Sequence, residues 1–318
     1  MDYKAVTGLA IAVLLICGLL IWLRYGYRRN TKRIERLTHR KVVIPLLAGG
    51  LGNQLFQIAN AYSAAIDTNS TMAIEQGTFG GCGFGSHPEK YYATVFAGFP
   101  LVDISPDMVI KEKTWTYYDM RPEIKNAFKN HNAVGLEGYW QSESYFVKHR
   151  NMLKALLVPR DVVKWLRTNT SVFLRYPELQ SSHSACFIGV RRGDYLKNPN
   201  LFNPCGMDYY RKAMAVTDAP IYYIASTDMD WCKANFVGDK FKFLEIKDEV
   251  ELLYTMTLFR NYIISNSSFY WWGSYLSLYD HPTVIAPDKW LFGKDVKWEQ
   301  YCTVYRDDMK VIEREVEM

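Results

Sequence analysis

The chain has 318 residues, 49% of them apolar and 22% charged, which is enough to bury one large core or two ordinary ones. The formal net charge is +5, but the excess is local, because eight basic residues and one acidic residue lie between Arg24 and Lys41. The remainder is close to neutral, so the composition gives no reason to expect a nucleic-acid-binding surface. The six cysteines include no C-x-x-C pair, which argues against a zinc site.

The first predicted element is a membrane anchor. After a short tail of residues 1–4, Ala5–Leu23 carries no charge and is just long enough to span a bilayer. No A-x-A cleavage pattern follows it, so we expect an uncleaved span rather than a signal peptide, followed by a basic stem over residues 24–40. The stem's charge favours the cytoplasm, whereas the glycosylation sequons at Asn69 and Asn169 would be useful only in a lumenal body. These signals leave the topology open.

A globular body begins near Lys41. An apolar run over 42–48, the glycine-rich "GGLGNQ" and a stretch with helical spacing over 55–67 predict a strand, a turn and a helix. Strands that alternate with helices predict an α/β body with a parallel sheet. The five cysteines of the body would suit one or two disulfides and a free thiol in a lumenal domain. Further strands are expected at 185–190, 221–225, 262–265 and 284–286, with helices at 207–217 and 250–259 among them.

The segment "VRRGDY" follows one of these apolar runs. Ligands of open α/β sheets bind at the carboxyl ends of strands, where helix N-termini present free N–H groups. Arginine binds phosphate oxygens through two parallel hydrogen bonds and stays charged at any working pH. Successive strand residues point to opposite faces, so either Arg191 or Arg192 could reach an anion while the other pairs with Asp194. A surface ion pair is the plainer alternative.

The segment "GGLGNQ" would let the backbone approach a phosphate or a sugar at Gly50 and Gly52. It lacks both the Walker G-K-[ST] and the third glycine of the dinucleotide fingerprint, which argues against kinases and dehydrogenases. Asn53 and Gln54 are unusual residues to open a helix, and capping by Asn53 is the structural alternative.

Two more strand ends carry polar residues. "STDMDW" holds Asp228 and Asp230, a D-x-D pair that could bind a divalent ion, although solvated turn carboxylates are the better interpretation. In "SNSSFYWWGSYLS", Ser267 or Ser268 would cap a helix and leave hydroxyl and N–H groups for an anion. The aromatic residues that follow, Trp271, Trp272 and Tyr275, are expected to pack that helix against the sheet. They also argue against glycosylation of the formal sequon at Asn266.

Six segments in order, "GGLGNQLFQ", "GYWQSESYF", "RRGDY", "YYIASTDMDW", "YIISNSSFYWWG" and "VIAPDKW", resemble those of the α1,2-fucosyltransferases, whose form of the fifth is "FIISNSSFSWWG". That family transfers L-fucose from GDP-fucose to O2 of a terminal galactose. The resemblance implies an inverting, metal-independent enzyme of the GT-B kind with two Rossmann-like halves, which we place at 41–180 and 181–318, after a single transmembrane helix. It also implies a type II Golgi membrane glycoprotein with a lumenal body that binds no cofactor beyond its donor.

The resemblance also assigns roles to residues. Arg191 should grip the GDP diphosphate, with Arg192 and Asp194 completing its motif, and Asn53 should lie near the donor sugar and the β-phosphate. Arg191, Asp194 and Asn53 are the expected catalytic residues. The expected donor-binding residues are Gly50, Gly52, Asn53, Gln54, Arg191, Arg192, Ser226, Asp228, Asn266, Ser267 and Ser268.

Two departures from the family pattern matter. Gly189 stands where the family's H-x-R-R-G-D motif has its histidine, and Thr227 replaces one of two paired acids. No base is evident, because Asp194, the one candidate, is weakened as a base by an arginine partner. A fucosyltransferase with a different acceptor and a catalytically silent, membrane-anchored protein that binds a glycan or GDP are the alternatives. A homodimer is compatible with the sequence.

Overall fold

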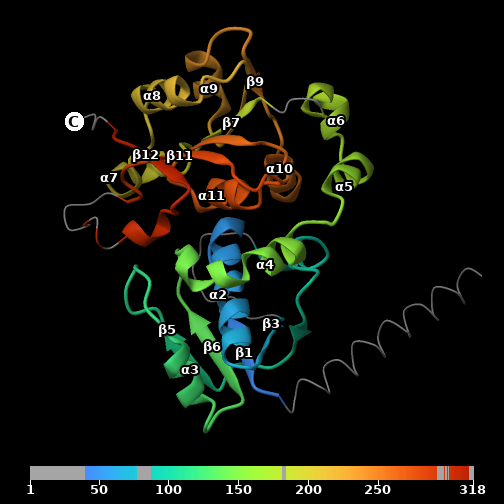
Figure 1. Cartoon of the computed structure of the whole chain (residues 1–318), viewed down its shortest axis with the longest axis vertical. Helices are drawn as coiled ribbons and strands as arrows, with labels where there is room; N and C mark the ends of the chain where they lie inside the picture. Colours follow the sequence, from blue (N-terminus) through green and yellow to red (C-terminus); the bar gives the residue numbers. More distant parts are fainter. Residues whose placement is uncertain are drawn as a thin grey trace, which may run out of the picture.

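Two parallel β-sheets organise the chain (Figure 1). The structure, a computed structural model, describes residues 40–76, 87–180, 184–291, 297, 299 and 301–314. The first sheet has the strand order β2-β1-β6-β5, the second has the order β12-β11-β10-β7-β8-β9, and β3 pairs with β4. Every pairing is parallel. The strands are β1 (Val42–Pro45), β2 (Thr71–Met72), β3 (Ile74–Glu75), β4 (Leu101–Val102), β5 (Met108–Lys111), β6 (Ala133–Glu137), β7 (Cys186–Val190), β8 (Tyr222–Ser226), β9 (Phe241–Phe243), β10 (Asn261–Ile264), β11 (Thr283–Pro287) and β12 (Met309–Ile312).

The helices connect these strands and lie on the faces of the sheets, as expected for an α/β body with parallel sheets. The expected helix at 207–217 is confirmed as α8, and the expected strands at 185–190, 221–225, 262–265 and 284–286 correspond to β7, β8, β10 and β11. The helices are α2 (Leu51–Asp67), α3 (Arg121–Ala127), α4 (Arg150–Leu157), α5 (Val162–Asn169), α6 (Val172–Arg175), α7 (Pro199–Phe202), α8 (Met207–Thr217), α9 (Met229–Asn235), α10 (Glu249–Met256) and α11 (Ser268–Tyr275).

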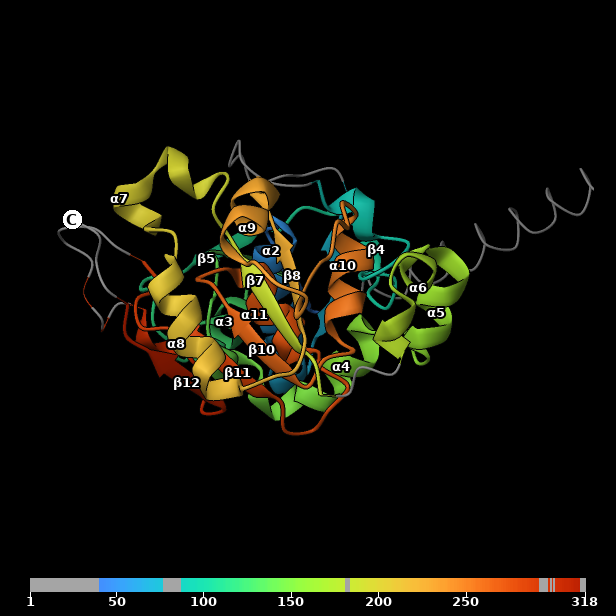
Figure 2. The same cartoon turned by 90° about the horizontal axis from the view of Figure 1, so that it is seen from above.

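The second sheet has the strand order of a dinucleotide-binding fold. Counted from β7, its strands run 3-2-1-4-5-6 from the β9 edge, and Figure 2 shows β7, β8, β10 and β11 side by side. Alternate residues of β7 are buried on opposite faces: Ile188 packs with Tyr209 of α8, whereas Phe187 packs with Tyr270 of α11. Burial on both faces explains why these strands are continuous apolar runs in the sequence.

Helix α2 begins earlier than the sequence predicts. The connection after β1 covers residues 46–50, and the helix starts at Leu51 rather than at residue 55. The N–H groups of Asn53 and Gln54 both donate to the carbonyl of Gly50, which draws them into the first helical turn. The side chain of Leu51 is buried, so packing outweighs the poor helix propensity of the neighbouring glycines.

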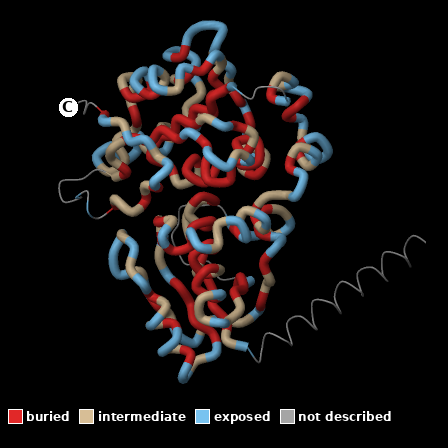
Figure 3. The backbone as a smooth tube through the Cα atoms, in the orientation of Figure 1, coloured by how far each residue is buried: buried red, intermediate tan, exposed pale blue. Residues whose placement is uncertain are grey.

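Aromatic side chains join the two halves of the molecule. Figure 3 shows buried backbone running through both sheets and through the junction of α2 with α11. Phe56 of α2 lies 4.5 Å from Trp271 and 5.2 Å from Trp272, measured between ring centroids, and Phe146 stacks on Trp272. The expectation that the tryptophans pack α11 against its sheet is therefore wrong, because they face α2. Tyr270 is the residue of α11 that packs on the sheet.

The predicted anchor at 5–23 and stem at 24–40 fall outside the described residues, apart from Arg40. In the part of the chain that the structure describes, no helix has both the length and the apolar character needed to cross a membrane. Four cysteines are described, and all four are free, so the expected disulfides do not form among them. They are Cys186, Cys205, Cys232 and Cys302.

Candidate active site

Segments at the carboxyl ends of strands from both sheets meet around one cavity of about 800 Å³. In the second sheet β7 neighbours β10, so the connections from these strands leave in opposite directions, and such a switch point opens a crevice at the carboxyl ends of the strands. In the first sheet β1 neighbours β6, and the chain leaves the end of β6 toward the second half of the molecule. The cavity wall includes Gly50, Gly52 and Asn53 after β1, Tyr139 and Gln141 after β6, Arg191 and Asp194 after β7, Ser226 at the end of β8, and Asn266, Ser267 and Ser268 after β10.

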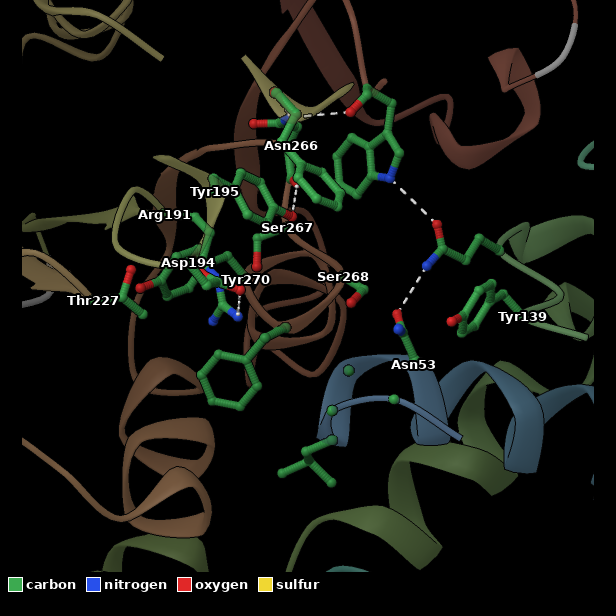
Figure 4. A pocket seen from close by; sticks show the side chains of 18 of the residues that line it. Asn53, Tyr139, Arg191, Asp194, Tyr195, Thr227, Asn266, Ser267, Ser268 and Tyr270 are labelled. Carbon is green, nitrogen blue, oxygen red and sulfur yellow. Dashed lines mark hydrogen bonds and ion pairs between the residues drawn. The ribbon is translucent and has the colours of Figure 1, made fainter. Parts of the chain in front are cut away.

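Arg191 is the cation that the end of β7 presents to the cavity (Figure 4). Its Nη2 donates to Oδ2 of Asp194 at 2.7 Å, and its guanidinium lies 5.6 Å from the ring centre of Tyr195. Burial lowers the pKa of Arg191, but the hydrogen bond to Asp194 and the charge of that carboxylate outweigh burial, so the pKa lies above its ordinary value. Arg191 is therefore a fixed, permanently charged group suited to bind an anion.

Arg192 points away from the cavity, unlike its neighbour. Its guanidinium lies 4.2 Å from the ring centre of Trp231, and its Nε is 3.6 Å from Oδ2 of Asp228. Asp228 in turn caps α9 by accepting the N–H of Trp231 at 3.2 Å. We predicted donor contacts for both Arg192 and Asp228, but neither lines the cavity, and their side chains instead hold the loop after β8.

Two helices begin at the cavity wall. Gly50 is the N-cap of α2 and Ser267 is the N-cap of α11, and neither residue makes a side-chain capping bond. A Cβ added to Gly52 would lie 2.4 Å from the backbone nitrogen of Phe269, so the two helix starts are in backbone contact. The first N–H groups of a helix have no partner within it, and its N-terminus carries partial positive charge. Two such ends beside Arg191 make this wall an anion-binding surface.

Comparison with known proteins assigns the family. The model described as "Glycosyl transferase family 11" matches residues 107–300, which is more than half of the chain. The chain belongs to glycosyl transferase family 11. An α-1,2-colitosyltransferase of Escherichia coli is 27% identical over 82% of this chain and 96% of the relative. WbnK, an O-antigen biosynthesis glycosyltransferase of the same organism, is 24% identical over 78% of this chain and 95% of the relative. Galactoside α-(1,2)-fucosyltransferase 2 of Oryctolagus cuniculus is 23% identical over 72% of this chain and 65% of the relative.

Several predicted site residues of this family 11 chain use their side chains to hold the cavity wall in place. The side-chain amide of Asn266 donates to the carbonyls of Phe202 and Trp290 at 2.7 and 2.9 Å, which fixes the turn before α11. This buried amide is engaged, in keeping with the expectation that its sequon is not glycosylated. Gln54 is also buried and donates to the carbonyl of Gly49. The hydroxyl of Ser226 accepts the N–H of Asp228.

Asn53 spans the cavity wall instead of capping its helix. Its Oδ1 accepts from Nε2 of Gln141 at 2.9 Å, and Oε1 of Gln141 accepts from Nε1 of Trp290 at 3.3 Å (Figure 4). These three residues follow β1, β6 and β11, so the chain of hydrogen bonds crosses from the first half of the molecule to the second. The capping alternative for Asn53 is therefore wrong.

Gly189, the departure from the family motif, lies beneath an aromatic ring. A Cβ at this position would lie 2.5, 2.6 and 2.8 Å from three ring carbons of Tyr270. Tyr270 is almost fully buried, and its hydroxyl donates to the carbonyls of Ala225 and Val190 at 3.2 and 3.4 Å. The ring thus occupies the space that a histidine at 189 would need. Tyr270 itself stands where the related segment has serine, so the two departures compensate each other sterically.

Sequence reasoning missed three residues that the first half contributes. Glu112, Trp115 and Tyr139 line the cavity, but no role was assigned to them. Tyr139 lies within "GYWQSESYF", which supported only the resemblance. Glu112 follows the short strand β5, and no local motif marks it.

The described residues hold no group of three or more histidine, cysteine or acidic side chains that could bind a metal ion. Asp228, the first carboxylate of the D-x-D pair, is engaged as a helix cap. The sequon residues Asn69 and Asn169 are both exposed. Asn69 has a φ of 52°, and the side-chain amide of Asn169 donates to the carbonyl of Trp165 at 2.9 Å. Their glycosylation and the independence from metal stay predictions.

Proposed function

We propose that this family 11 glycosyltransferase transfers L-fucose from GDP-fucose to O2 of a terminal β-galactose with inversion. Family membership supports glycosyl transfer, and the rabbit relative named as a galactoside α-(1,2)-fucosyltransferase supports fucose as the transferred sugar and a galactoside as the acceptor. The observation that carries the proposal is the meeting of Arg191 with the N-termini of α2 and α11 at one cavity. This wall suits the diphosphate of a sugar nucleotide.

The proposed chemistry follows from where charge develops. As the bond between the sugar and the diphosphate breaks, negative charge grows on the β-phosphate and the sugar becomes oxocarbenium-like. Donors that are fixed beforehand stabilise such charge without reorganising, which is commonly the largest catalytic contribution. Arg191, held by Asp194, and the free N–H groups near Gly50 and Ser268 are donors of this kind. An acceptor hydroxyl that attacks the opposite face of the sugar gives inversion.

The decisive assay is GDP release from GDP-fucose by the full chain in detergent, with EDTA present, across a panel of β-galactosides. Product linkage would be determined by NMR, and fucose on O2 of galactose is the expected result. If the product carries fucose at another position or on another acceptor, that acceptor position would replace O2 of galactose in the proposal. Tight GDP binding without transfer would instead support a silent binding protein.

Arg191→Ala tests whether the Arg191 side chain binds the diphosphate of GDP. We expect this variant to lose GDP binding by a factor of about 100, since a charge-assisted pair of hydrogen bonds is lost. Arg192→Ala is the matched control, because the Arg192 side chain packs on Trp231 outside the cavity and its loss should leave the Kd for GDP unchanged. Calorimetric titration with GDP measures both. Equal effects of the two substitutions would contradict the assignment of Arg191.

Colitose is a second candidate for the transferred sugar. The relative at 27% identity is named as a colitosyltransferase and is covered over 96% of its length. Competition between GDP-fucose and GDP-colitose in the same assay decides between the two donors. A higher kcat/KM with GDP-colitose would replace fucose in the proposal.

We also propose that residues 5–23 anchor the protein in the Golgi membrane with the catalytic body in the lumen. The exposed sequons at Asn69 and Asn169 provide the test. A mass shift on treatment with an N-glycosidase, lost in an Asn69→Gln and Asn169→Gln double variant, is expected for a lumenal body. Extraction of the full chain from membranes by alkaline carbonate would contradict the anchor.

A further inference from the structure

Among the described residues, three carboxylates line the cavity, and they differ in their partners. Asp194 is paired with Arg191. Oε2 of Glu249 accepts a hydrogen bond from the hydroxyl of Tyr91 and lies 3.6 Å from Nζ of Lys90. Glu112 has no lysine, arginine or histidine partner within the described ranges, and its hydrogen bonds come from backbone N–H groups alone. A proton acceptor in this cavity needs a carboxylate that no cation holds, and Glu112 meets this requirement.

The turn after β6 is shaped around the Glu112 carboxylate. Its Oε2 accepts the N–H of Tyr139 at 2.7 Å, and its Oε1 accepts the N–H of Trp140 at 3.1 Å. Gly138 has a φ of 154°, and a Cβ there would lie 2.4 Å from Cβ of Glu112. Trp140, fully buried, has a φ of 55°, an unfavourable conformation for a bulky residue. Backbone strain of this kind clusters at functional sites, because only a rigid surrounding structure maintains it.

The carboxylate keeps the capacity to take a proton. A carboxylate can accept about four hydrogen bonds, so the two backbone donors leave lone pairs available, and Glu112 lines the cavity. Burial raises the pKa of Glu112, the bonds from Trp140 and Tyr139 lower it, and the net pKa lies above its ordinary value. A raised pKa makes a carboxylate a better base near neutral pH.

Exposed aromatic side chains lie on the same wall as Glu112. Trp115 is 56% exposed and Tyr139 is 44% exposed, although both line the cavity. Figure 4 shows Tyr139 on the side of Asn53, across the cavity from Arg191 and Asp194. Large aromatic side chains with accessible faces supply rigid apolar contact area for a ligand. This wall therefore combines a platform with a base, across the cavity from Arg191 and Asp194.

We propose that the wall formed by Glu112, Trp115 and Tyr139 is the acceptor subsite and that Glu112 is the catalytic base. This inference rests on the proposed function. In the step, the oxygen of an acceptor sugar hydroxyl forms a bond to C1 of the donor sugar. The bond from C1 to the β-phosphate oxygen breaks, and its electron pair leaves with the nucleoside diphosphate. The hydroxyl proton moves to a carboxylate oxygen of Glu112 and is later released to water.

Glu112→Gln tests the base in the full chain with GDP-fucose and a β-galactoside. The amide keeps the shape of the side chain but cannot take the proton, so we expect kcat to fall by a factor of about 100 to 10,000. The Kd for GDP and the melting temperature should remain those of the wild type. Glu137→Gln is the matched control, because this exposed glutamate on the neighbouring strand β6 pairs with Lys111 and does not line the cavity.

Each result distinguishes the base from other roles. Wild-type kcat in Glu112→Gln would overturn the proposal and leave the proposed function intact. If Glu112→Gln lowers both GDP binding and kcat, the proposal is overturned as well, because Glu112 would then support the fold of the cavity. If Glu112→Gln does not fold, Glu112→Asp decides, since the retracted carboxylate keeps its charge and should still lower kcat by at least about tenfold. A wild-type enzyme that transfers to no acceptor would overturn both proposals.

Tyr139→Ala tests the platform separately from the base. We expect KM for the acceptor to rise about tenfold, as for the loss of roughly 1.4 kcal/mol of contact, with kcat and the Kd for GDP unchanged. Tyr139→Phe keeps the ring and should bring the acceptor KM back from the value of Tyr139→Ala toward that of the wild type. A rise in KM for GDP-fucose with an unchanged acceptor KM would move this residue to the donor side and overturn the acceptor subsite.

Discussion

At the residue scale, Gly189 and Tyr270 form one unit. Gly189→Ala places a methyl group within 2.8 Å of the Tyr270 ring, and overpacking of this kind costs about 1–3 kcal/mol of the free energy of unfolding. Because Tyr270 also anchors α11 to β7, affinity for GDP should fall as well. Adding Tyr270→Ser removes the ring that the methyl group meets. Urea unfolding of the two single variants and the double variant should therefore show a coupling of at least about 0.5 kcal/mol, and purely additive effects would contradict the steric account.

Also at the residue scale, Glu112 should give the enzyme an acid limb in its pH–rate profile. Only the deprotonated carboxylate can accept a proton, so kcat falls as pH drops through its pKa. Burial holds that pKa above the ordinary value of 4.5, and the rings of Tyr118 and Tyr145 lie near the same carboxylate. The loss of activity should begin at a higher pH than an ordinary glutamate would give. Steady-state rates across pH should show this limb in the wild type, and its persistence in Glu112→Gln would assign it to another group.

At the scale of elements, the anion-binding wall depends on how closely α2 approaches α11. Gly52→Ala would place a Cβ 2.4 Å from the backbone of Phe269, which no rotation of a side chain relieves. We expect the starts of the two helices to move apart. The free energy of unfolding should fall by at least about 1–3 kcal/mol, and the affinity for GDP should fall as well. Urea unfolding and calorimetric titration with GDP check the two effects. A stable Gly52→Ala protein that binds GDP normally would show that the close contact is not needed.

The same elements show what the sequence could predict. Strands β7, β8, β10 and β11 were predictable because they are buried on both faces and read as continuous apolar runs. Strands β2, β3 and β4 have two residues each, too few for any periodicity. Arg191 and Ser267 were found because they follow strands that the sequence predicts, Arg191 immediately and Ser267 three residues after the end of β10. Glu112 was not, because the turn at Gly138, 26 residues further on, is what gives its carboxylate a setting.

At the scale of the whole molecule, the cavity belongs to neither half alone. The second half supplies Arg191 and the start of α11, while the first half supplies the start of α2, Glu112 and Tyr139. A donor and an acceptor can react only if these walls hold a fixed separation, since rates depend steeply on the alignment of the reacting atoms. The hydrogen bonds from Asn53 through Gln141 to Trp290 cross between the halves at the cavity itself. They are therefore placed to set that separation.

Gln141→Ala should reveal this role. The substitution removes two hydrogen bonds, each worth about 1 kcal/mol, from the link between the halves. We expect kcat/KM for transfer to fall by a factor of about 10 to 30, because the aligned arrangement of the walls becomes less populated. The melting temperature should change little, since the aromatic contacts of Phe56 with Trp271 and Trp272 still join the halves. Gln180→Ala is the control, because this glutamine accepts from Arg167 at an exposed site outside the cavity. Equal kinetics for both variants would show that the link does not govern the separation of the walls.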